Sequence, residues 1–154
     1  MKIEVVNDAR LIAKLNEPVQ TLHHELYPEK FKSFDFNAIY NYFHEVMSMD
    51  HQHFLVCFDG DEAIGYIWFE EIIKIGNAFS NPSHYLYIQH VSVNENMRGK
   101  GVSKLLFDEV LKFANSKSIK RIGLDYWSKN TVAKQIYKKL GFIVEKETTY
   151  LTLQ

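Results

Sequence analysis

The chain has 154 residues, of which 46% are hydrophobic, and its 18 basic and 19 acidic side chains give a formal charge of −1. This length and composition predict one domain over residues 1–154 with a single ordinary core. The near-neutral charge argues against nucleic acid or an anionic membrane as the main partner. The one cysteine, Cys57, excludes an internal disulfide and a cysteine-built metal site.

The beginning of the chain does not resemble a secretion signal. Glu4 and Asp8 fall where such a signal needs an unbroken apolar stretch. No segment approaches the roughly 20 apolar residues that a membrane-spanning helix requires. We therefore expect a cytoplasmic protein without a membrane partner.

A short strand and two helices are predicted before the main sheet. Residues 2–6 alternate loosely between polar and apolar side chains, and apolar residues then recur at helical spacing over residues 11–26. Pro18 is expected to kink this first helix. Asp35 begins a second helical pattern, which extends to Val46.

Three strands are predicted next. Residues 53–58 and 63–73 are rich in β-branched and aromatic side chains, and Asp59-Gly60-Asp61-Glu62 between them is typical of a hairpin turn. After a loop that contains glycine, asparagine and proline, a further strand is expected over residues 85–93.

The rest of the chain predicts one β-α-β unit, a last helix and a closing strand. An amphipathic helix over residues 102–114 leads to a short strand over residues 121–126. Ser128 is suited to cap the last helix, Gly141 to end it, and residues 142–153 to form the final strand. The residues of the last helix expected to face inward are Val132, Ala133, Ile136, Tyr137 and Leu140. Elements in this order predict an α/β (α+β) domain with a mixed, largely antiparallel sheet.

The segment Met97-Arg98-Gly99-Lys100-Gly101-Val102-Ser103-Lys104 joins the strand over residues 85–93 to the helix after it. A turn at this place exposes unpaired backbone N–H groups at the positive end of the helix dipole, which suits a phosphate or a diphosphate. The two glycines allow a ligand to approach the backbone closely. Side chains that add positive charge are Arg98, Lys100 and Lys104. Taken alone, these residues fit an anion site and a solvated glycine turn equally well.

Two nucleotide-binding motifs do not match this segment. A Walker A loop is excluded because no Gly-x-x-x-x-Gly-Lys-Ser/Thr spacing occurs. A dinucleotide fingerprint lacks its third glycine, although Asp125 ends the next strand as a ribose-binding acid would. After Asp125 the chain has room for one helix and one strand, whereas that fold needs several further β-α units.

Two spaced blocks resemble the GNAT acetyltransferases. The first reads Arg/Gln-x-x-Gly-x-Gly/Ala and is occupied by Arg98, Gly101 and Ser103, with serine in place of the last small residue. The second block matches Asn130, Ala133, Tyr137, Gly141 and Phe142. The similarity covers residues 85–142. It implies the GNAT fold, a mixed and mostly antiparallel twisted sheet of about six to seven strands flanked by about four helices.

The resemblance implies an N-acetyltransferase that uses acetyl-CoA. In the family, the strand before the glycine turn splays from the next strand, and its free backbone groups hold the pantetheine arm and polarise the carbonyl. Tyr137 matches the usual general acid, which would protonate the departing thiolate. The residues expected to bind acetyl-CoA are Val91, Ser92, Val93, Arg98, Gly99, Lys100, Gly101, Val102, Ser103, Lys104 and Asn130.

No general base can be assigned from the sequence. Many relatives carry a glutamate where this chain has Gln89, which accepts no proton at neutral pH. His90 follows it and is expected on the opposite face of a regular strand. Other titratable candidates for the base are His23, His24, Glu70, Glu71 and Asp125, each of which also fits a structural or solvent-exposed role. The amine has the alternative of losing its proton to water.

The acceptor side is less defined than the donor side. The resemblance implies that residues 22–27 and 31–36 wall the acceptor site, and we expect His23, Tyr27 and Gln89 to contact a small amine. Without an acidic cluster at ligand spacing, no metal is expected. The final strand is also a candidate for pairing with a second copy in a homodimer.

Three functions from different classes remain at this stage. The first is acetylation of a primary amine on a small molecule. The second is acetylation of a protein lysine or N-terminus. The third is a non-catalytic sensor of acyl-CoA, which the missing glutamate keeps open.

Overall fold

A computed structural model describes all of residues 1–154. Its five strands are β1 (Lys2–Val5), β2 (Gln52–Asp59), β3 (Glu62–Lys74), β4 (Ser83–Val93) and β5 (Ile122–Leu124). Its four α-helices are α1 (Ala9–Leu26), α2 (Phe36–Val46), α3 (Val102–Ser116) and α4 (Thr131–Lys139), and a short 3₁₀ turn, η1 (Glu95–Met97), precedes α3. No helix is both long and apolar enough to span a membrane.

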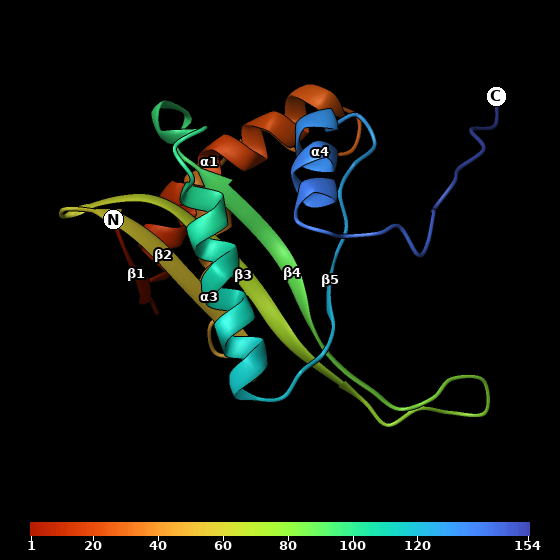
Figure 1. The fold of residues 1–154 in the computed structure, drawn as a ribbon. Coiled ribbons are helices and arrows are strands. Elements are labelled where there is room, and N and C mark those ends of the chain that lie inside the picture. Colours follow the sequence, from red (N-terminus) through yellow and green to blue (C-terminus); the bar gives the residue numbers. More distant parts are fainter.

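The strands form one mixed sheet in the order β1-β2-β3-β4-β5. All neighbours are antiparallel except β4 and β5, which run parallel and are joined through α3. Helix α3 covers one face of the sheet, and α1 and α2 cover the other (Figure 1). The predicted α/β class and the mostly antiparallel sheet are confirmed.

Each face of the sheet has its own hydrophobic cluster. On the α3 face, the cluster centres on Leu106 and Val110 of the helix and on Ile67 and Leu86 of the strands. On the α1 and α2 face, Phe43 lies at the centre of an aromatic group. Its ring makes edge contacts with Phe54, Tyr66, Trp68 and His90. The helices therefore cover both faces of the sheet.

The boundaries of α1 follow from its sequence. The Asp8 carboxylate accepts hydrogen bonds from the N–H groups of Arg10 and Leu11, which would otherwise lack partners at the first turn. Pro18, which was expected to kink the helix, lies inside it, and α1 continues without interruption to Leu26.

The prediction of a final strand was wrong. Residues 142–154 form neither helix nor strand, and they extend away from the rest of the molecule (Figure 1). The sheet therefore has five strands and not six or seven, and β5 is one of its two edge strands.

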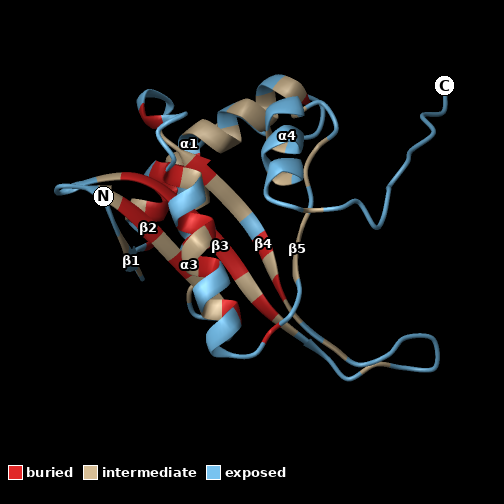
Figure 2. Ribbon diagram, in the orientation of Figure 1, coloured by how far each residue is buried: buried red, intermediate tan, exposed pale blue.

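The inward face predicted for α4 was also largely wrong. Val132, Ile136 and Leu140 are exposed, and the helix contains no buried residue (Figure 2). Only Tyr137 packs against the cluster on the α3 face.

Candidate active site

The candidate site lies where β4 and β5 separate. The two strands pair only over residues 86–88 of β4 and 122–124 of β5. Beyond this point Val91, Ser92 and Val93 still pair with β3 but have no strand on the β5 side. Backbone N–H and C=O groups on that side are therefore available to a ligand.

A β-bulge lies at the same point. His90 pairs with Trp68 and Ile88 pairs with Phe69, so Gln89 is an extra residue on β4. Before the bulge Leu86 and Ile88 pack on the α3 side, and after it Val91 and Val93 do so. The alternation of side chains thus shifts by one residue at Gln89.

The bulge overturns the expectation that Gln89 and His90 lie on opposite faces. The His90 ring contacts Asn16 and Tyr66 on the α1 side of the sheet. Gln89 Nε2 donates to Glu70 Oε2 at 3.1 Å on the same side. Regular alternation fails here because a bulge turns two successive side chains toward one face.

The glycine turn provides open N–H groups. Gly101 has φ +83° and occupies the N-cap position of α3, and no side chain caps the helix. Gly99 has φ +76°, and a Cβ at either glycine would meet nothing within 4 Å. The positive φ therefore requires glycine at both positions, and the first-turn N–H groups of α3 stay free for an anion.

Basic side chains surround this turn without strong partners. The Arg98 guanidinium lies 3.8 Å from the Glu95 carboxylate, and Lys104 Nζ lies 2.7 Å from Asp108. Both pairs are solvent-exposed, so an anionic ligand would compete with them at little cost. Residues 98–104, which were predicted to form an anion site, lie together at the N-terminus of α3.

Ser92 adds a buried polar atom beside the opening. Its side chain is 3% exposed, and the hydroxyl oxygen has no hydrogen-bond partner. Burial of an unpaired hydroxyl is unfavourable in the free protein. This orphaned group is consistent with a ligand that approaches the free edge of β4.

Helix α4 forms the other wall of the opening. The Asn130 side chain caps the helix through a hydrogen bond from the Ala133 N–H. The ring of Tyr137 lies among Phe107, Tyr126 and Phe142, and burial raises the pKa of its phenol to about 12. The hydroxyl therefore keeps its proton at neutral pH, and it makes no hydrogen bond within the chain.

Two carboxylates lie on the α1 side of the opening without a cationic partner. The Tyr87 hydroxyl donates to Asp125 Oδ2 at 2.7 Å, and Glu70 accepts from Gln89. Glu70 and Tyr87 are directly opposite each other on β3 and β4. Because Tyr87 is hydrogen-bonded to Asp125, the carboxylates of Glu70 and Asp125 lie on the same face. The sequence marked both acids only as titratable candidates and missed Tyr87. No signal in it indicated this grouping.

The two histidines of this region are neutral at physiological pH. Burial lowers the pKa of His23, although Asp125 acts against this shift, and its ring packs on Phe31. Burial lowers the pKa of His90 to about 4. His90 Nδ1 lies within hydrogen-bond reach of Asn16 and Tyr66, so the half-buried ring is engaged on the α1 side of the sheet.

Tyr27 joins α1 to the loop before α4. Its side chain is 8% exposed, and its hydroxyl lies 3.1 Å from Ser128 Oγ and accepts from the Lys129 N–H. These hydrogen bonds, the one with Ser128 first, lower the pKa of the phenol. The structure thus gives Tyr27 an anchoring contact at the edge of the site.

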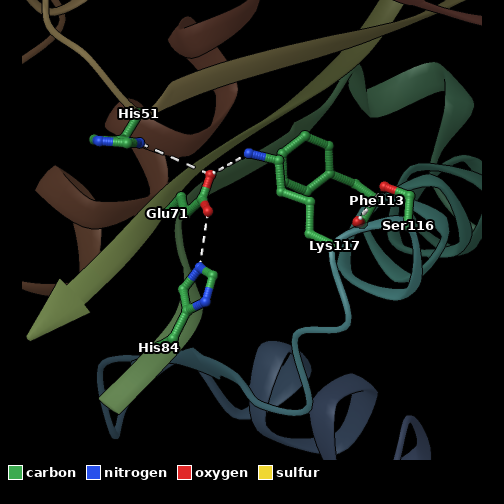
Figure 3. Close-up of polar contacts among 6 residues, drawn as sticks. All are labelled: His51, Glu71, His84, Phe113, Ser116 and Lys117. Atoms are coloured by element: carbon green, nitrogen blue, oxygen red, sulfur yellow. Dashed lines mark hydrogen bonds and ion pairs between the residues drawn. The ribbon is translucent and has the colours of Figure 1, made fainter. Parts of the chain in front are cut away.

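Glu71 lies far from the opening. Its buried carboxylate contacts Lys117 at 2.8 Å, His84 at 2.8 Å and His51 at 3.8 Å (Figure 3). Lys117 follows the C-terminus of α3, about 22 Å along the helix from the glycine turn. This group ties the end of α3 to the sheet, and Glu71 is therefore not a base for this site.

The fold agrees with what comparison with known proteins finds. A model of the family described as "Acetyltransferase (GNAT) family" matches residues 16–142. The chain belongs to this family, as the two sequence blocks predicted.

Solved structures resemble the whole chain. A tetramutant of the BH1408 protein from Bacillus halodurans superposes with a TM-score of 0.92 at 23% identity, over 99% of this chain and 100% of that one. The apo aminoglycoside 6′-N-acetyltransferase AAC(6′)-IG from Acinetobacter haemolyticus does so with a TM-score of 0.73 at 16% identity, over 100% and 99%. AAC(6′)-Iy, in complex with the bisubstrate analogue CoA-S-monomethyl-acetylneamine, gives 0.69 at 18% identity, over 99% and 97%.

Proposed function

We propose that this protein is an acetyl-CoA-dependent N-acetyltransferase that acetylates a primary amine of a small cationic molecule by direct attack. The observation that carries the proposal is the continuity of β4 with the glycine turn. A free strand edge at residues 91–93 leads, within a few residues, to the uncapped N-terminus of α3. A single ligand with an amide-bearing arm and a diphosphate matches both features.

Acetyl-CoA supplies an activated acyl group as a thioester. In our proposal, the backbone of Val91, Ser92 and Val93 holds its pantetheine arm, and the N–H groups of residues 99–104 hold its diphosphate, assisted by Arg98, Lys100 and Lys104. Asn130 keeps its side-chain NH₂ group free while its oxygen caps α4, and that group is a further donor toward the arm.

Tyr137 is the proposed general acid. Its phenol is protonated at neutral pH, makes no hydrogen bond within the chain and projects from α4, which forms one wall of the opening. It would donate its proton to the thiolate as the thiolate leaves. We assign no base, since Gln89 cannot accept the proton, His90 is engaged by Asn16 and Tyr66, and Glu70 and Asp125 are assigned to the cationic acceptor. We propose that the amine loses its proton to water.

The charge of the opening favours a cationic acceptor. Neither Glu70 nor Asp125 has an ion pair, and each accepts a hydrogen bond from a neutral side chain. A substrate with two or more amino groups would place one amine for reaction and pair another with these acids. The similarity to aminoglycoside acetyltransferases supports acceptors of this kind, with His23 and Gln89 beside them.

Release of the CoA thiol across a panel of acceptors tests the proposal. The panel pairs aminoglycosides and polyamines with amino acids and lysine peptides of equal concentration. Cys57 is fully buried and burial raises the pKa of its thiol, so the native protein adds little to the signal. Turnover confined to multiply charged small amines is the expected result. Absence of CoA ester binding would refute the proposal. Binding of acetyl-CoA without turnover of any acceptor would favour the non-catalytic acyl-CoA sensor, which is consistent with Gln89 in place of a glutamate.

The acceptor carboxylates give a narrower test. Glu70→Gln and Asp125→Asn should each raise KM for a polyamine by roughly 3- to 10-fold, an effect that high salt weakens. The Kd for acetyl-CoA should not change. Glu145→Gln is the matched control, because Glu145 is an exposed acid outside the opening whose partner is Arg121. An equal rise of KM in the control would contradict a specific role for the two acids.

A further inference from the structure

His90 lies on β4 between the β-bulge and the free strand edge that begins at Val91. Its Nδ1 atom lies 3.2 Å from the Tyr66 hydroxyl and 3.4 Å from Asn16 Nδ2. Asn16 Nδ2 also donates to the Tyr66 hydroxyl at 2.8 Å. Side chains from α1, β3 and β4 therefore form one hydrogen-bonded triangle beneath the helix.

This triangle determines which nitrogen of His90 carries the proton. Tyr66 is fully buried, and burial raises the pKa of its phenol, so the hydroxyl keeps its proton. That proton has His90 Nδ1 as its acceptor, because the other neighbour, the Asn16 NH₂ group, is itself a donor. Nδ1 therefore accepts, and the neutral ring carries its hydrogen on Nε2.

The Nε2 atom of His90 is accessible to solvent. The buried side-chain nitrogen and oxygen atoms that lack a partner are His53 Nε2 and Ser92 Oγ. His90 Nε2 is not one of them, although it makes no hydrogen bond within the chain. The titratable groups whose charges act on the ring are His23 and Asp125, which belong to the acceptor side of the opening. The Nε2–H group is therefore available to a ligand in the opening.

We infer that His90 is a fixed hydrogen-bond donor to the acceptor substrate and selects primary amines that carry a hydroxyl or ether oxygen near the reacting nitrogen. The inference rests on the proposed acetyl transfer and narrows its substrate class. An N–H donor needs a lone pair on its partner, and a protonated amine has none. In the proposed site Glu70 and Asp125 take ammonium groups, so the group that His90 requires is an oxygen.

A plain polyamine would leave this donor unsatisfied. The ring is uncharged at neutral pH, because burial lowers the pKa of His90 to about 4. Binding of a polyamine would remove water from Nε2–H and supply no acceptor in exchange. An amino alcohol or an amino sugar supplies one. A site that hydrogen-bonds one substrate group rejects analogues without that group more strongly than an apolar site does.

Asn16 and Tyr66 are positioning residues in this arrangement. Asn16 is 2% exposed and lies inside α1, although asparagine is a weak helix former. Its buried NH₂ group donates to Tyr66, which in turn holds His90 in one tautomer. With Nδ1 occupied and Nε2 protonated, the ring cannot take the proton of the attacking amine. Its role is therefore recognition.

A matched pair of diamines tests the selection. Diaminopropanol and diaminopropane carry the same two amino groups and differ by one hydroxyl. Release of the CoA thiol should give the wild type a preference for diaminopropanol of roughly 10-fold or more in kcat/KM. His90→Leu should abolish this preference by losing activity on diaminopropanol alone. Equal kcat/KM values in the wild type, or a preference that survives in the variant, would overturn the inference.

His44→Leu is the matched control for the loss of a histidine. His44 is exposed on α2, and its ring packs on Tyr40. This variant should keep the preference for diaminopropanol. Far-ultraviolet circular dichroism and the Kd for acetyl-CoA should match the wild type in both variants, which shows that the fold is retained. Loss of the preference in His44→Leu as well would contradict a specific role for His90.

Nitrogen NMR of the imidazole rings tests the tautomer without turnover. The wild type at neutral pH should show His90 protonated at Nε2 and unprotonated at Nδ1. Tyr66→Phe should admit the other tautomer and reduce the preference for diaminopropanol by roughly 3- to 10-fold. In the complex with CoA, diaminopropanol should shift the Nε2 signal and diaminopropane should not. A proton on Nδ1 in the wild type would overturn the inference.

The two measurements separate the inference from the proposed function. If both diamines are acetylated equally, acetyl transfer stands and selection by His90 is wrong. If neither is acetylated and Nε2 still responds to diaminopropanol alone, His90 is the donor and the proposed transfer fails. If neither is acetylated and Nε2 responds to neither diamine, both are wrong.

Discussion

Residues 1–119 and residues 120–154 differ sharply in how they are held. The first region contains every buried residue of the protein, around two clusters on the faces of the sheet, and after Ile119 no side chain is buried (Figure 2). Yet Asp125, Asn130 and Tyr137 belong to the second region. The candidate site therefore joins a firmly packed wall, made by β4 and the glycine turn, to one that the chain barely fixes. Stability should depend on the first region and chemistry on both.

The largest effect is expected at Tyr137. Tyr137→Phe removes the proposed acid and keeps the ring among Phe107 and Phe142. We expect kcat to fall by roughly 10²- to 10⁴-fold, while the Kd for acetyl-CoA and the unfolding midpoint stay close to wild type. Single-turnover measurements check this, and Tyr126→Phe is the control for loss of a neighbouring phenol. Unchanged turnover would remove Tyr137 from the mechanism.

Truncation of one apolar residue in each region compares their stability directly. Phe43 is 1% exposed and contacts five aromatic rings, so Phe43→Ala should lower the free energy of unfolding by about 3–5 kcal/mol. Ile136→Ala on α4 should cost under about 1 kcal/mol, because this side chain is partly exposed. Urea unfolding measures both values. Similar losses would show that the second region is packed more firmly than its exposure indicates.

The pH dependence of stability should reveal the lowered pKa of His90. His90 has a folded pKa of about 4, below its ordinary value, so the unfolded state binds more protons between about pH 4 and 6.5. The free energy of unfolding should therefore rise with pH across this window and level off above it. His53 and Glu71, whose pKa values are also lowered, act in the same direction.

A variant separates the contribution of His90 from the others. His90→Gln keeps a polar side chain beside Asn16 and Tyr66 but does not titrate. The wild type should gain on the order of 1–3 kcal/mol more than the variant between pH 4 and 7. Parallel curves for the two proteins would mean that His90 is solvated and the packing around it is looser than described.

The smallest effect is expected at the glycine turn. Gly101→Ala forces a side chain into φ +83°, which costs about 1–2 kcal/mol, and should weaken acetyl-CoA binding by roughly 10-fold as the turn relaxes. Gly60→Ala is the matched control, because Gly60 has φ +61° in the β2–β3 turn and equally open surroundings. It should lower stability without changing the Kd. Equal Kd values for both variants would contradict a binding role for the turn.

The sequence predicted the parts of the fold that short-range patterns determine. The Asp59–Glu62 turn, the strands of the hairpin and the start of α2 at Asp35 all appear as expected, because turns and helix starts depend on a few neighbouring residues. The closing strand was not predictable, since β-propensity in residues 142–153 says nothing about the presence of a partner. The predicted inward face of α4 was wrong for the same reason, because helical spacing of apolar residues does not show whether anything covers them.

The site was predictable to the extent that it consists of backbone. Glycines at positions 99 and 101 permit the positive φ values that this turn has, so the sequence was enough to indicate a turn there. The Glu70–Gln89 and Tyr87–Asp125 contacts join residues 19 and 38 positions apart and depend on strand register. The register depends on the β-bulge at Gln89, which no local sequence pattern predicted. The roles of Asn130 and Tyr137 remain predictions.

Gln89, the extra residue at the bulge, interrupts the alternation of side chains that the sequence of β4 otherwise specifies. If Gln89 is omitted, the strand reads as an unbroken alternation: Leu86, Ile88, Val91 and Val93 toward α3, and the residues between them toward α1. Every side chain would then keep its present face without the extra position. Gln89 is thus dispensable to the folding pattern of β4, and a one-residue deletion there would separate the requirements of folding from those of the opening beside β5.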